Sequence, residues 1–275
     1  MSEIKRFISV KIVIIKTIII VVFFFFTVIN NAFSESVSFE GEITGGNKLI
    51  FNGIMMKPDG GGPFPAVVML HGCDGLDSVH ASNTYNTWAS RLVSWGYVTL
   101  QVDSLGPRGE TNICGKSMRV APFERIFDAY AGKSYLANQS YVNKNRIAVM
   151  GWSHGGWTAL YAVNKNTLKF IRAEPYRAAI AFYPWCGVSE IHLITPLLIL
   201  IGEEDDWTPA NRCKNLKLEP ETTNEVNLKV YPKAHHGFDF EGVNIELEGH
   251  QLKYDPAATR DAIIQVKKFL AKHLR

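Results

Sequence analysis

Residues 146–157 have the sequence Arg-Ile-Ala-Val-Met-Gly-Trp-Ser-His-Gly-Gly-Trp, and this stretch decides the fold that we predict. Its apolar first half indicates a buried strand, and a helical pattern begins at His154. Between them, Gly151-Trp152-Ser153-His154-Gly155 matches G-x-S-x-G, which in a strand–turn–helix context raises a serine hydroxyl above the end of a sheet. Without that context the motif is only a glycine-rich turn with an incidental serine. The context favours Ser153 as a nucleophile.

Outward from this segment, short apolar runs alternate with longer amphipathic ones. The Val-, Ile- and Leu-rich runs predict an α/β fold with a mostly parallel central sheet and helices on both faces. Its chemistry is then expected at the carboxyl ends of the strands. Strands are expected at 49–56, 66–70, 97–102, 147–150, 178–182, 197–201 and 226–231. Helices are expected at 84–95, 122–138, 154–163 and 257–273.

A serine nucleophile needs a base, and the base needs an acid that orients it. In this type of fold the acid and then the histidine follow the serine along the chain. After the strand at 197–201 comes Glu203-Glu204-Asp205-Asp206, and after the strand at 226–231 come His235 and His236. The order and the spacing leave all four acids and both histidines open.

A second loop completes the expected site. The strand at 66–70 runs into His71-Gly72-Cys73, and the loop after this kind of strand supplies one of two backbone amides that bind an oxyanion. We expect the amides of Cys73 and His154 to form this pair. His71 precedes the serine, so we expect it to brace the loop rather than act as the base.

Taken together, these segments resemble the dienelactone hydrolase family of α/β-hydrolases over residues 40–273. The resemblance rests on five motifs in the family's order. In that family the acid lies three residues after a glycine and four before a proline, which implies Asp205. The base directly precedes Gly-Phe, which implies His236. The motifs are His71-Gly72-x-x-Gly75, Asp103-Ser-Leu-Gly-Pro-Arg-Gly109, Gly151-Trp-Ser-His-Gly-Gly156, Gly202-x-x-Asp205-x-x-x-Pro209 and His236-Gly-Phe238.

This sequence departs from the family's namesake at the nucleophile, where Ser153 stands in place of a cysteine. The difference points away from the namesake's lactone substrate and toward a serine esterase. Arg108 lies at the rim that the resemblance implies. There it either binds a substrate carboxylate or braces the loop through Asp103, and bracing is favoured. Trp152 and Trp207 are expected to pack under the loops or to contact the substrate, as are Trp157 and Trp185.

The sequence contains four cysteines and no C-x-x-C pair, so we expect disulfides and no metal site. Four cysteines allow three pairings, and the sequence alone does not choose between them. In the fold that the resemblance implies, Cys73 and Cys114 follow consecutive strands, and Cys186 and Cys213 follow the two strands beyond the elbow. We therefore expect the disulfides Cys73–Cys114 and Cys186–Cys213.

The first 34 residues form a separate segment. A basic stretch is followed by the apolar run 17–29 and by Ala32-Phe33-Ser34, which is the layout of a secretory signal peptide cleaved after Ser34. The alternative is an uncleaved membrane anchor. Residues 35–275 are predicted to form one catalytic domain, with a periplasmic or secreted location. Beyond residue 34 the chain holds 25 basic and 25 acidic residues, which argues against a nucleic-acid partner.

The predicted activity is hydrolysis of a small-molecule carboxylic ester or lactone by Ser153, His236 and Asp205, with no cofactor. The alternatives are a small peptidase of the prolyl oligopeptidase type, and a non-catalytic envelope protein that binds a ligand and keeps the fold. A propeller or other gating domain usually accompanies such peptidases, and about 240 residues leave no room for one. A complete triad argues against the binding protein. The oligomeric state does not follow from the sequence.

Overall fold

The computed structural model describes residues 33–187, 191–219 and 225–275. The predicted leader therefore lies outside the described residues, except for its last two. An eight-stranded sheet with the order β1-β2-β4-β3-β5-β6-β7-β8 forms the centre. Strands β3 to β8 pair in parallel, whereas β1 and β2 join antiparallel at one edge. The strands are β1 (Phe33–Glu42), β2 (Lys48–Lys57), β3 (Phe64–Leu70), β4 (Val98–Asp103), β5 (Val142–Trp152), β6 (Ala178–Phe182), β7 (Leu197–Gly202) and β8 (Val226–Tyr231).

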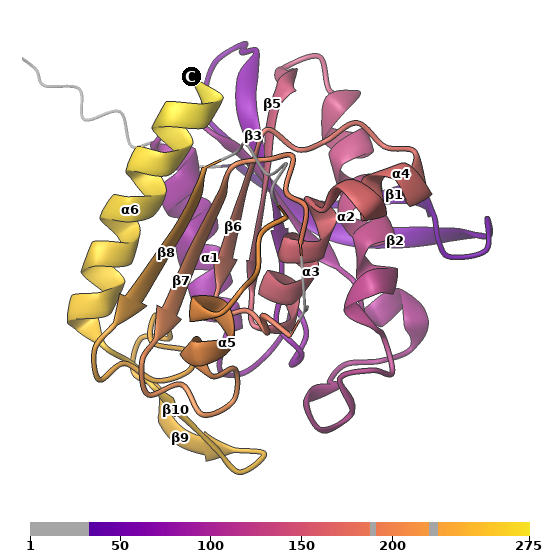
Figure 1. Cartoon of the computed structure of the whole chain (residues 1–275). Helices are drawn as coiled ribbons and strands as arrows, with labels where there is room; N and C mark the ends of the chain where they lie inside the picture. The colour runs from indigo at the N-terminus through magenta and orange to yellow at the C-terminus, as the bar shows by residue number, and fades with distance from the viewer. Residues whose placement is uncertain (1–32, 188–190, 220–224) are drawn as a thin grey trace, which may run out of the picture.

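Helices cover both faces of this sheet, as expected for an α/β fold (Figure 1). Helices α2 and α3 pack on one face, and α1 and α6 lie side by side on the other. Lys267 Nζ on α6 is 5.4 Å from the centre of the Trp95 ring, which directly follows α1. The central strands are buried on both sides, which explains their continuous apolar sequences. The helices are α1 (Ser82–Ser94), α2 (Pro122–Ala137), α3 (His154–Ala162), α4 (Lys165–Ile171), α5 (Ala210–Lys214) and α6 (Pro256–Leu274), with 3₁₀ turns at Gly106–Arg108 and Cys114–Lys116.

The predicted fold class is confirmed, and each expected strand and helix is present with its ends within two residues, except that β5 begins five residues earlier than expected. Four features were not predicted from the sequence: β1, α4, α5 and the hairpin formed by β9 (Asn244–Leu247) and β10 (His250–Lys253). The predicted cleavage site after Ser34 falls inside β1, where Ser34 pairs with Met56. Among residues 34–42 of β1, only Val37 and Phe39 are buried, because this strand lies at the edge of the sheet.

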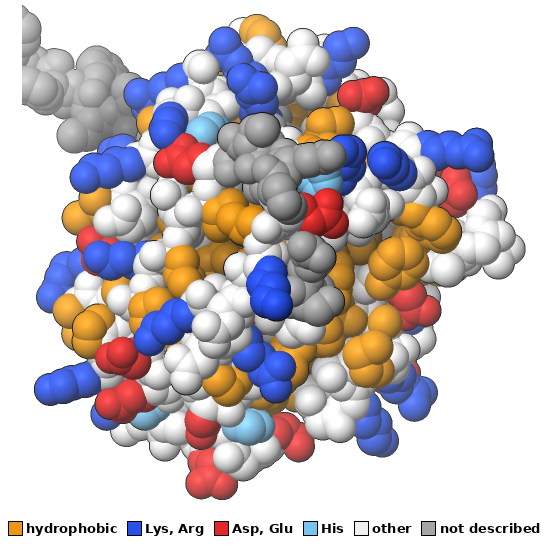
Figure 2. Space-filling model, viewed as in Figure 1, with side chains coloured by type: hydrophobic (Ala, Val, Ile, Leu, Met, Phe, Trp, Pro, Cys, Tyr) orange, Lys and Arg blue, Asp and Glu red, His pale blue; other side chains and the backbone are white. Residues whose placement is uncertain are grey.

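The parallel strands all end at the same edge of the sheet, the lower edge in Figure 1. Helix α5 and the β9–β10 hairpin lie at this edge and add to its walls. On the face seen in Figure 2, basic and acidic side chains are interspersed, in line with the balanced charge of residues 35–275. None of the helices in the described ranges is long and apolar enough to cross a membrane.

Candidate active site

Ser153 occupies the sharp turn between β5 and α3. Its backbone has φ 52° and ψ −113°, a conformation that non-glycine residues rarely adopt. The two motif glycines permit this turn. A Cβ on Gly151 would lie 2.1 Å from the Gly155 carbonyl oxygen, and a Cβ on Gly155 would lie 2.2 Å from that of Leu70. The motif therefore forms the strained turn that its sequence predicts.

The structure brings Ser153, His236 and Asp205 into one line of hydrogen bonds. His236 Nε2 lies 3.0 Å from Ser153 Oγ, and His236 Nδ1 lies 2.9 Å from Asp205 Oδ2. His236 and Asp205 are each 3% exposed, so water does not compete strongly for either contact. This arrangement can move a proton from the serine to the imidazole while the carboxylate orients the ring.

Burial distinguishes Asp205 from the three acids beside it. Its Oδ1 accepts hydrogen bonds from the amides of Trp207, at 3.0 Å, and Thr208, at 2.7 Å, which hold the carboxylate in place. The other three acids have exposed side chains that pair with Lys214, His235 and His250, respectively; they are Glu203, Glu204 and Asp206. Only Asp205 contacts a histidine that also reaches Ser153.

The two amides expected to bind an oxyanion border the space beside Ser153. Cys73 and His154 both line a hollow that contains the serine. In the described part of the chain, neither amide donates a hydrogen bond within the protein. Both N–H groups are therefore available to an oxygen of a bound molecule.

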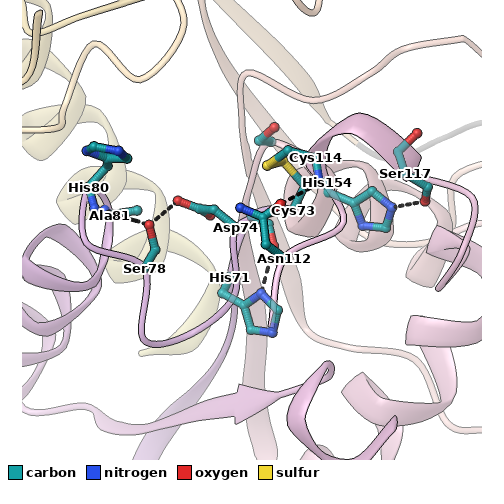
Figure 3. Close-up of a disulfide and its surroundings, with 12 residues drawn as sticks. His71, Cys73, Asp74, Ser78, His80, Ala81, Asn112, Cys114, Ser117 and His154 are labelled. Atoms are coloured by element: carbon teal, nitrogen blue, oxygen red, sulfur yellow. Dashed lines mark hydrogen bonds between the residues drawn. A yellow bond between two sulfur atoms is a disulfide. The ribbon is translucent and has the colours of Figure 1, made fainter. Parts of the chain in front are cut away.

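Disulfides join Cys73 to Cys114 and Cys186 to Cys213, the two pairs that the resemblance implied. Figure 3 shows the first of them beside His154, whose ring points to the Ser117 carbonyl. Ile113 N also donates to Cys73 O, at 2.8 Å, so the oxyanion loop is tied to the segment after β4 by two links.

A buried arginine, which the sequence analysis missed, connects the two segments that carry these amides. Arg125 on α2 is fully buried, and burial lowers its pKa to about 10. Its Nη1 donates to His154 Nδ1 at 2.8 Å, and its Nη2 donates to the His71 carbonyl, also at 2.8 Å. Burial and then this cation lower the pKa of His154 to about 3. His154 is thus neutral, and its Nε2–H donates to the Ser117 carbonyl at 2.8 Å.

His71 braces the loop, as predicted. Burial lowers the pKa of His71 well below its usual value, so the ring is neutral. The amide of Ser104 donates to its Nε2 at 3.1 Å, which places the proton on Nδ1, and Nδ1–H donates to the Gly72 carbonyl at 2.7 Å. In a trans peptide the carbonyl and the next N–H point in opposite directions. The Cys73 N–H is therefore held pointing away from His71.

Asp239 supports the loop that carries His236, and this residue was also missed. It is fully buried, which raises its pKa, and its carboxylate accepts hydrogen bonds from Trp88, Trp152 and Tyr183 at 2.9, 3.0 and 2.7 Å. The Tyr183 ring in turn packs against His236, with 4.6 Å between the ring centres. This network joins the histidine loop to the aromatic core under the site.

Arg108 and Trp152, for which substrate contact was one of two alternatives, both have structural contacts. Arg108 braces its loop through Asp128, at 2.9 and 2.7 Å, and through the Ser104 carbonyl, at 2.7 Å, rather than through Asp103. Its guanidinium is therefore already engaged by a carboxylate. Trp152 is fully buried in the core, because it points below the turn while Ser153 points above it. Of the two alternatives for Trp152, the structure therefore supports packing and not substrate contact.

Trp207 does border the site, together with Trp157 and Trp185. Its ring lies 5.2 Å from that of His236 and stacks on His250 at 4.9 Å. His250 belongs to the β9–β10 hairpin, and Lys253 of the same hairpin donates its amide to the His236 carbonyl at 3.1 Å. The hairpin thus supports both the base and the wall beside it. Within the described ranges, no group of three or more His, Cys, Asp or Glu side chains is placed to hold a metal ion.

The chain is similar to known proteins in sequence and in fold. Residues 51–274 match the Dienelactone hydrolase family. The crystal structure of a putative dienelactone hydrolase from Klebsiella pneumoniae subsp. pneumoniae is similar in fold, with a TM-score of 0.63 and 17% identity. That similarity covers 86% of this chain and 99% of the other.

Among curated proteins, this chain is 35% identical to a probable dipeptidyl-aminopeptidase B from Grosmannia clavigera, over 70% of this chain. The match spans only 22% of that longer protein. A probable 2-oxo-3-(5-oxofuran-2-ylidene)propanoate lactonase from Bradyrhizobium sp. is 23% identical, over 80% of this chain and 88% of that protein.

Proposed function

This chain belongs to the dienelactone hydrolase family, and on that premise we propose that it is a serine hydrolase that cleaves carboxylic esters through an acyl-enzyme. The line of hydrogen bonds from Ser153 through His236 to Asp205 carries the proposal. All three groups are needed for covalent hydrolysis, and each is positioned by a different segment of the chain.

The reaction begins when Ser153 Oγ attacks the ester carbonyl carbon and His236 Nε2 takes the hydroxyl proton. The carbonyl oxygen becomes an oxyanion, which the free amides of Cys73 and His154 stabilise. His236 then passes its proton to the departing alcohol, and the acyl group stays on Ser153. Water attacks this acyl-enzyme with the same proton transfers, so the products are an acid and an alcohol.

Arg125 and His71 act here as positioning residues. One guanidinium holds the His71 carbonyl on one side and the His154 ring on the other. The spacing between the two oxyanion amides therefore depends on the buried Arg125 side chain. Donors fixed before the reaction stabilise the developing charge without reorganising, and each is worth roughly 3 kcal/mol.

The family and its relatives leave the substrate class open among esters, lactones and amides. The hollow that Cys73 and His154 line beside Ser153 favours an ester or lactone over a dipeptidyl substrate. The described residues lining this hollow include no carboxylate that would bind the ammonium group of a peptide N-terminus. We therefore place peptidase activity second.

Labelling and a matched pair of variants test the proposal. The full chain should react with a fluorophosphonate probe and hydrolyse 4-nitrophenyl butyrate. Ser153→Ala should abolish labelling and lower kcat at least about 10³-fold, because the nucleophile is lost. Ser90→Ala, an exposed serine on α1, should leave both unchanged. Unaltered esterase activity in folded Ser153→Ala would refute the proposal, and faster cleavage of a Gly-Pro arylamide than of the ester would favour the peptidase.

We also propose that the protein acts outside the cytoplasm. The two disulfides are consistent with an oxidising compartment. The prediction from the leader is a mature N-terminus at Glu35. Mass spectrometry of the protein isolated from its own cells checks this, and a start before residue 30 would contradict cleavage after Ser34.

A further inference from the structure

Two hollows meet at Ser153, and they differ in size. The larger has a volume of about 300 Å³, at the lower end of the range for small-molecule sites. Its walls are largely apolar, with three indole rings and the disulfide that joins the two loops; they include Trp157, Trp185, Trp207, Cys73 and Cys114. The rings of Trp157 and Trp185 lie 6.3 Å apart, centre to centre. Such a wall suits a flat apolar group.

The smaller hollow has a volume of about 20 Å³, which is space for roughly one water-sized group. It lies between His236 and the β9–β10 hairpin, whose Leu247 and Leu252 close it together with Phe240. Leu252 and Phe240 are buried, so this wall is part of the packed structure.

The chemistry of the triad assigns one side of an ester to each hollow. In the tetrahedral intermediate on Ser153, the departing oxygen must lie near His236 Nε2, because it receives the proton held there. His236 borders the smaller hollow and not the larger one, whereas His154, which carries an oxyanion amide, borders only the larger. The leaving alcohol therefore faces the smaller hollow, and the acyl group faces the larger.

We infer that this enzyme prefers esters formed by a bulky, uncharged aromatic acid and a small alcohol. This inference rests on the proposed function, because it needs Ser153 as nucleophile and His236 as base. The acyl side is uncharged as well as apolar. Its lining contains no Asp, Glu, Lys or Arg among the described residues, and the pKa of His154, about 3, keeps that side chain neutral. Arg108 is held by Asp128. The Arg212 guanidinium stacks on the Trp185 ring, with 3.9 Å between Cζ and the ring centre, and is not among the residues that line the hollow.

An isomeric pair of esters tests the assignment directly. Methyl phenylacetate and benzyl acetate have the same formula and both release an alkyl alcohol, but the ring lies on the acyl side in one and on the alcohol side in the other. We expect kcat/KM of the full chain to be at least about tenfold higher for methyl phenylacetate. Methyl (4-carboxyphenyl)acetate should be at least about tenfold poorer than methyl phenylacetate, because its carboxylate would be buried without a partner.

Variants of the two walls locate the preference. Trp185→Ala should lower kcat/KM for methyl phenylacetate at least about tenfold and change that for methyl acetate much less. Phe170→Ala, which removes an aromatic ring 62% exposed and outside the site, is its control. Leu247→Ala should open the smaller hollow and raise turnover of benzyl acetate relative to methyl phenylacetate. Leu218→Ala, 41% exposed, is the matched control for that change.

The outcomes separate this inference from the proposed function. Labelling of Ser153 together with equal or reversed preference between the isomers would overturn the inference and leave the serine hydrolase intact. Labelling without turnover of methyl phenylacetate would do the same. Absence of both labelling and hydrolysis of any ester would instead refute the proposed function. If Trp185→Ala does not fold, the wild-type preference and Leu247→Ala still decide the question.

Discussion

Arg125 Nη1 donates a hydrogen bond to His154 Nδ1 across 2.8 Å, and both side chains are buried. The same guanidinium donates to the carbonyl of His71, so it bridges the segment after β3 and the first turn of α3. These segments carry the Cys73 and His154 amides. A cation far from the solvent thus holds together the two halves of the expected oxyanion site.

Replacing Arg125 tests that bridge. Arg125→Met leaves His154 Nδ1 and the His71 carbonyl without their donor, and we expect kcat to fall about 10–100-fold with a much smaller change in KM. The reason is that misplaced amides weaken binding of the transition state more than binding of the ester. Steady-state kinetics on a 4-nitrophenyl ester gives both constants.

Two further variants control this measurement. Arg125→Lys keeps the positive charge but cannot reach both acceptors, so it should restore activity only partly. Arg119→Met removes an exposed arginine paired with Glu110 and should leave kcat unchanged. A folded Arg125→Met protein with wild-type kcat would show that the bridge does not position the amides.

The acid of the triad gives a second prediction. Asp205→Asn keeps the size of the side chain but removes the charge that orients and stabilises His236, so kcat should fall about 10⁴-fold. Glu203→Gln, two residues away with an exposed side chain, should change kcat less than about twofold. Circular dichroism confirms that each variant is folded. Equal losses in both variants would mean that Asp205 has no special role.

Asp205 and its three acidic neighbours show how much of the site could be predicted from the sequence. Spacing from Ser153 left four acids open, and the family motif selected one, which burial and two backbone amides distinguish in the structure. The strands of the core were predictable because each is a continuous apolar run. The β9–β10 hairpin was not, because its strands are only four residues long: polar and apolar residues alternate in Asn244–Leu247 over too short a stretch to stand out, and His250–Lys253 does not alternate.

Arg125 and Asp239 were missed for a different reason. A charged residue within an amphipathic helix or a loop is normally solvated, and nothing adjacent in the sequence marks these two as buried. Their partners are contributed by distant segments: His71 and His154 for Arg125, and Trp88, Trp152 and Tyr183 for Asp239. For Trp152 the sequence left packing and substrate contact both open, because it does not tell which side of the turn each residue of the elbow faces.

The Cys73–Cys114 disulfide should matter for turnover as well as for stability. Cys73→Ser/Cys114→Ser removes a link between residues 41 apart, and the chain-entropy relation gives a loss of about 4 kcal/mol in the free energy of unfolding. The same change frees the loop that presents the Cys73 amide, so kcat should also fall about tenfold or more. Urea unfolding and steady-state kinetics measure the two effects separately.

The second disulfide provides the matched control. Cys186→Ser/Cys213→Ser removes a link between residues 27 apart and should lower the free energy of unfolding by a similar amount, about 3–4 kcal/mol. Neither of these cysteines carries an oxyanion amide, so kcat of the folded protein should change much less. If both double variants lose kcat equally, stability alone explains the loss and the first disulfide has no particular effect on the site.

The buried His154 predicts how stability depends on pH. Its pKa is about 3 in the folded protein, whereas the unfolded chain takes up a proton near the usual value of 6.5. Protonation therefore favours the unfolded state, and the corresponding stability is lost as the pH falls from about 6.5 toward 3. His154→Gln stays neutral and can still accept from Arg125, so this loss should disappear.

Comparing the two proteins isolates this contribution from the other buried groups. The lowered pKa of His71 acts in the same direction, and the raised pKa values of Asp74, Asp128 and Asp239 act in the opposite one, but all four groups are present in both proteins. Between pH 7 and pH 4, the free energy of unfolding should fall by on the order of 3 kcal/mol more for wild type than for His154→Gln. Urea unfolding followed by tryptophan fluorescence gives both curves. Parallel curves over this range would mean that His154 takes up its proton equally readily in the folded and unfolded states, contrary to the burial seen here.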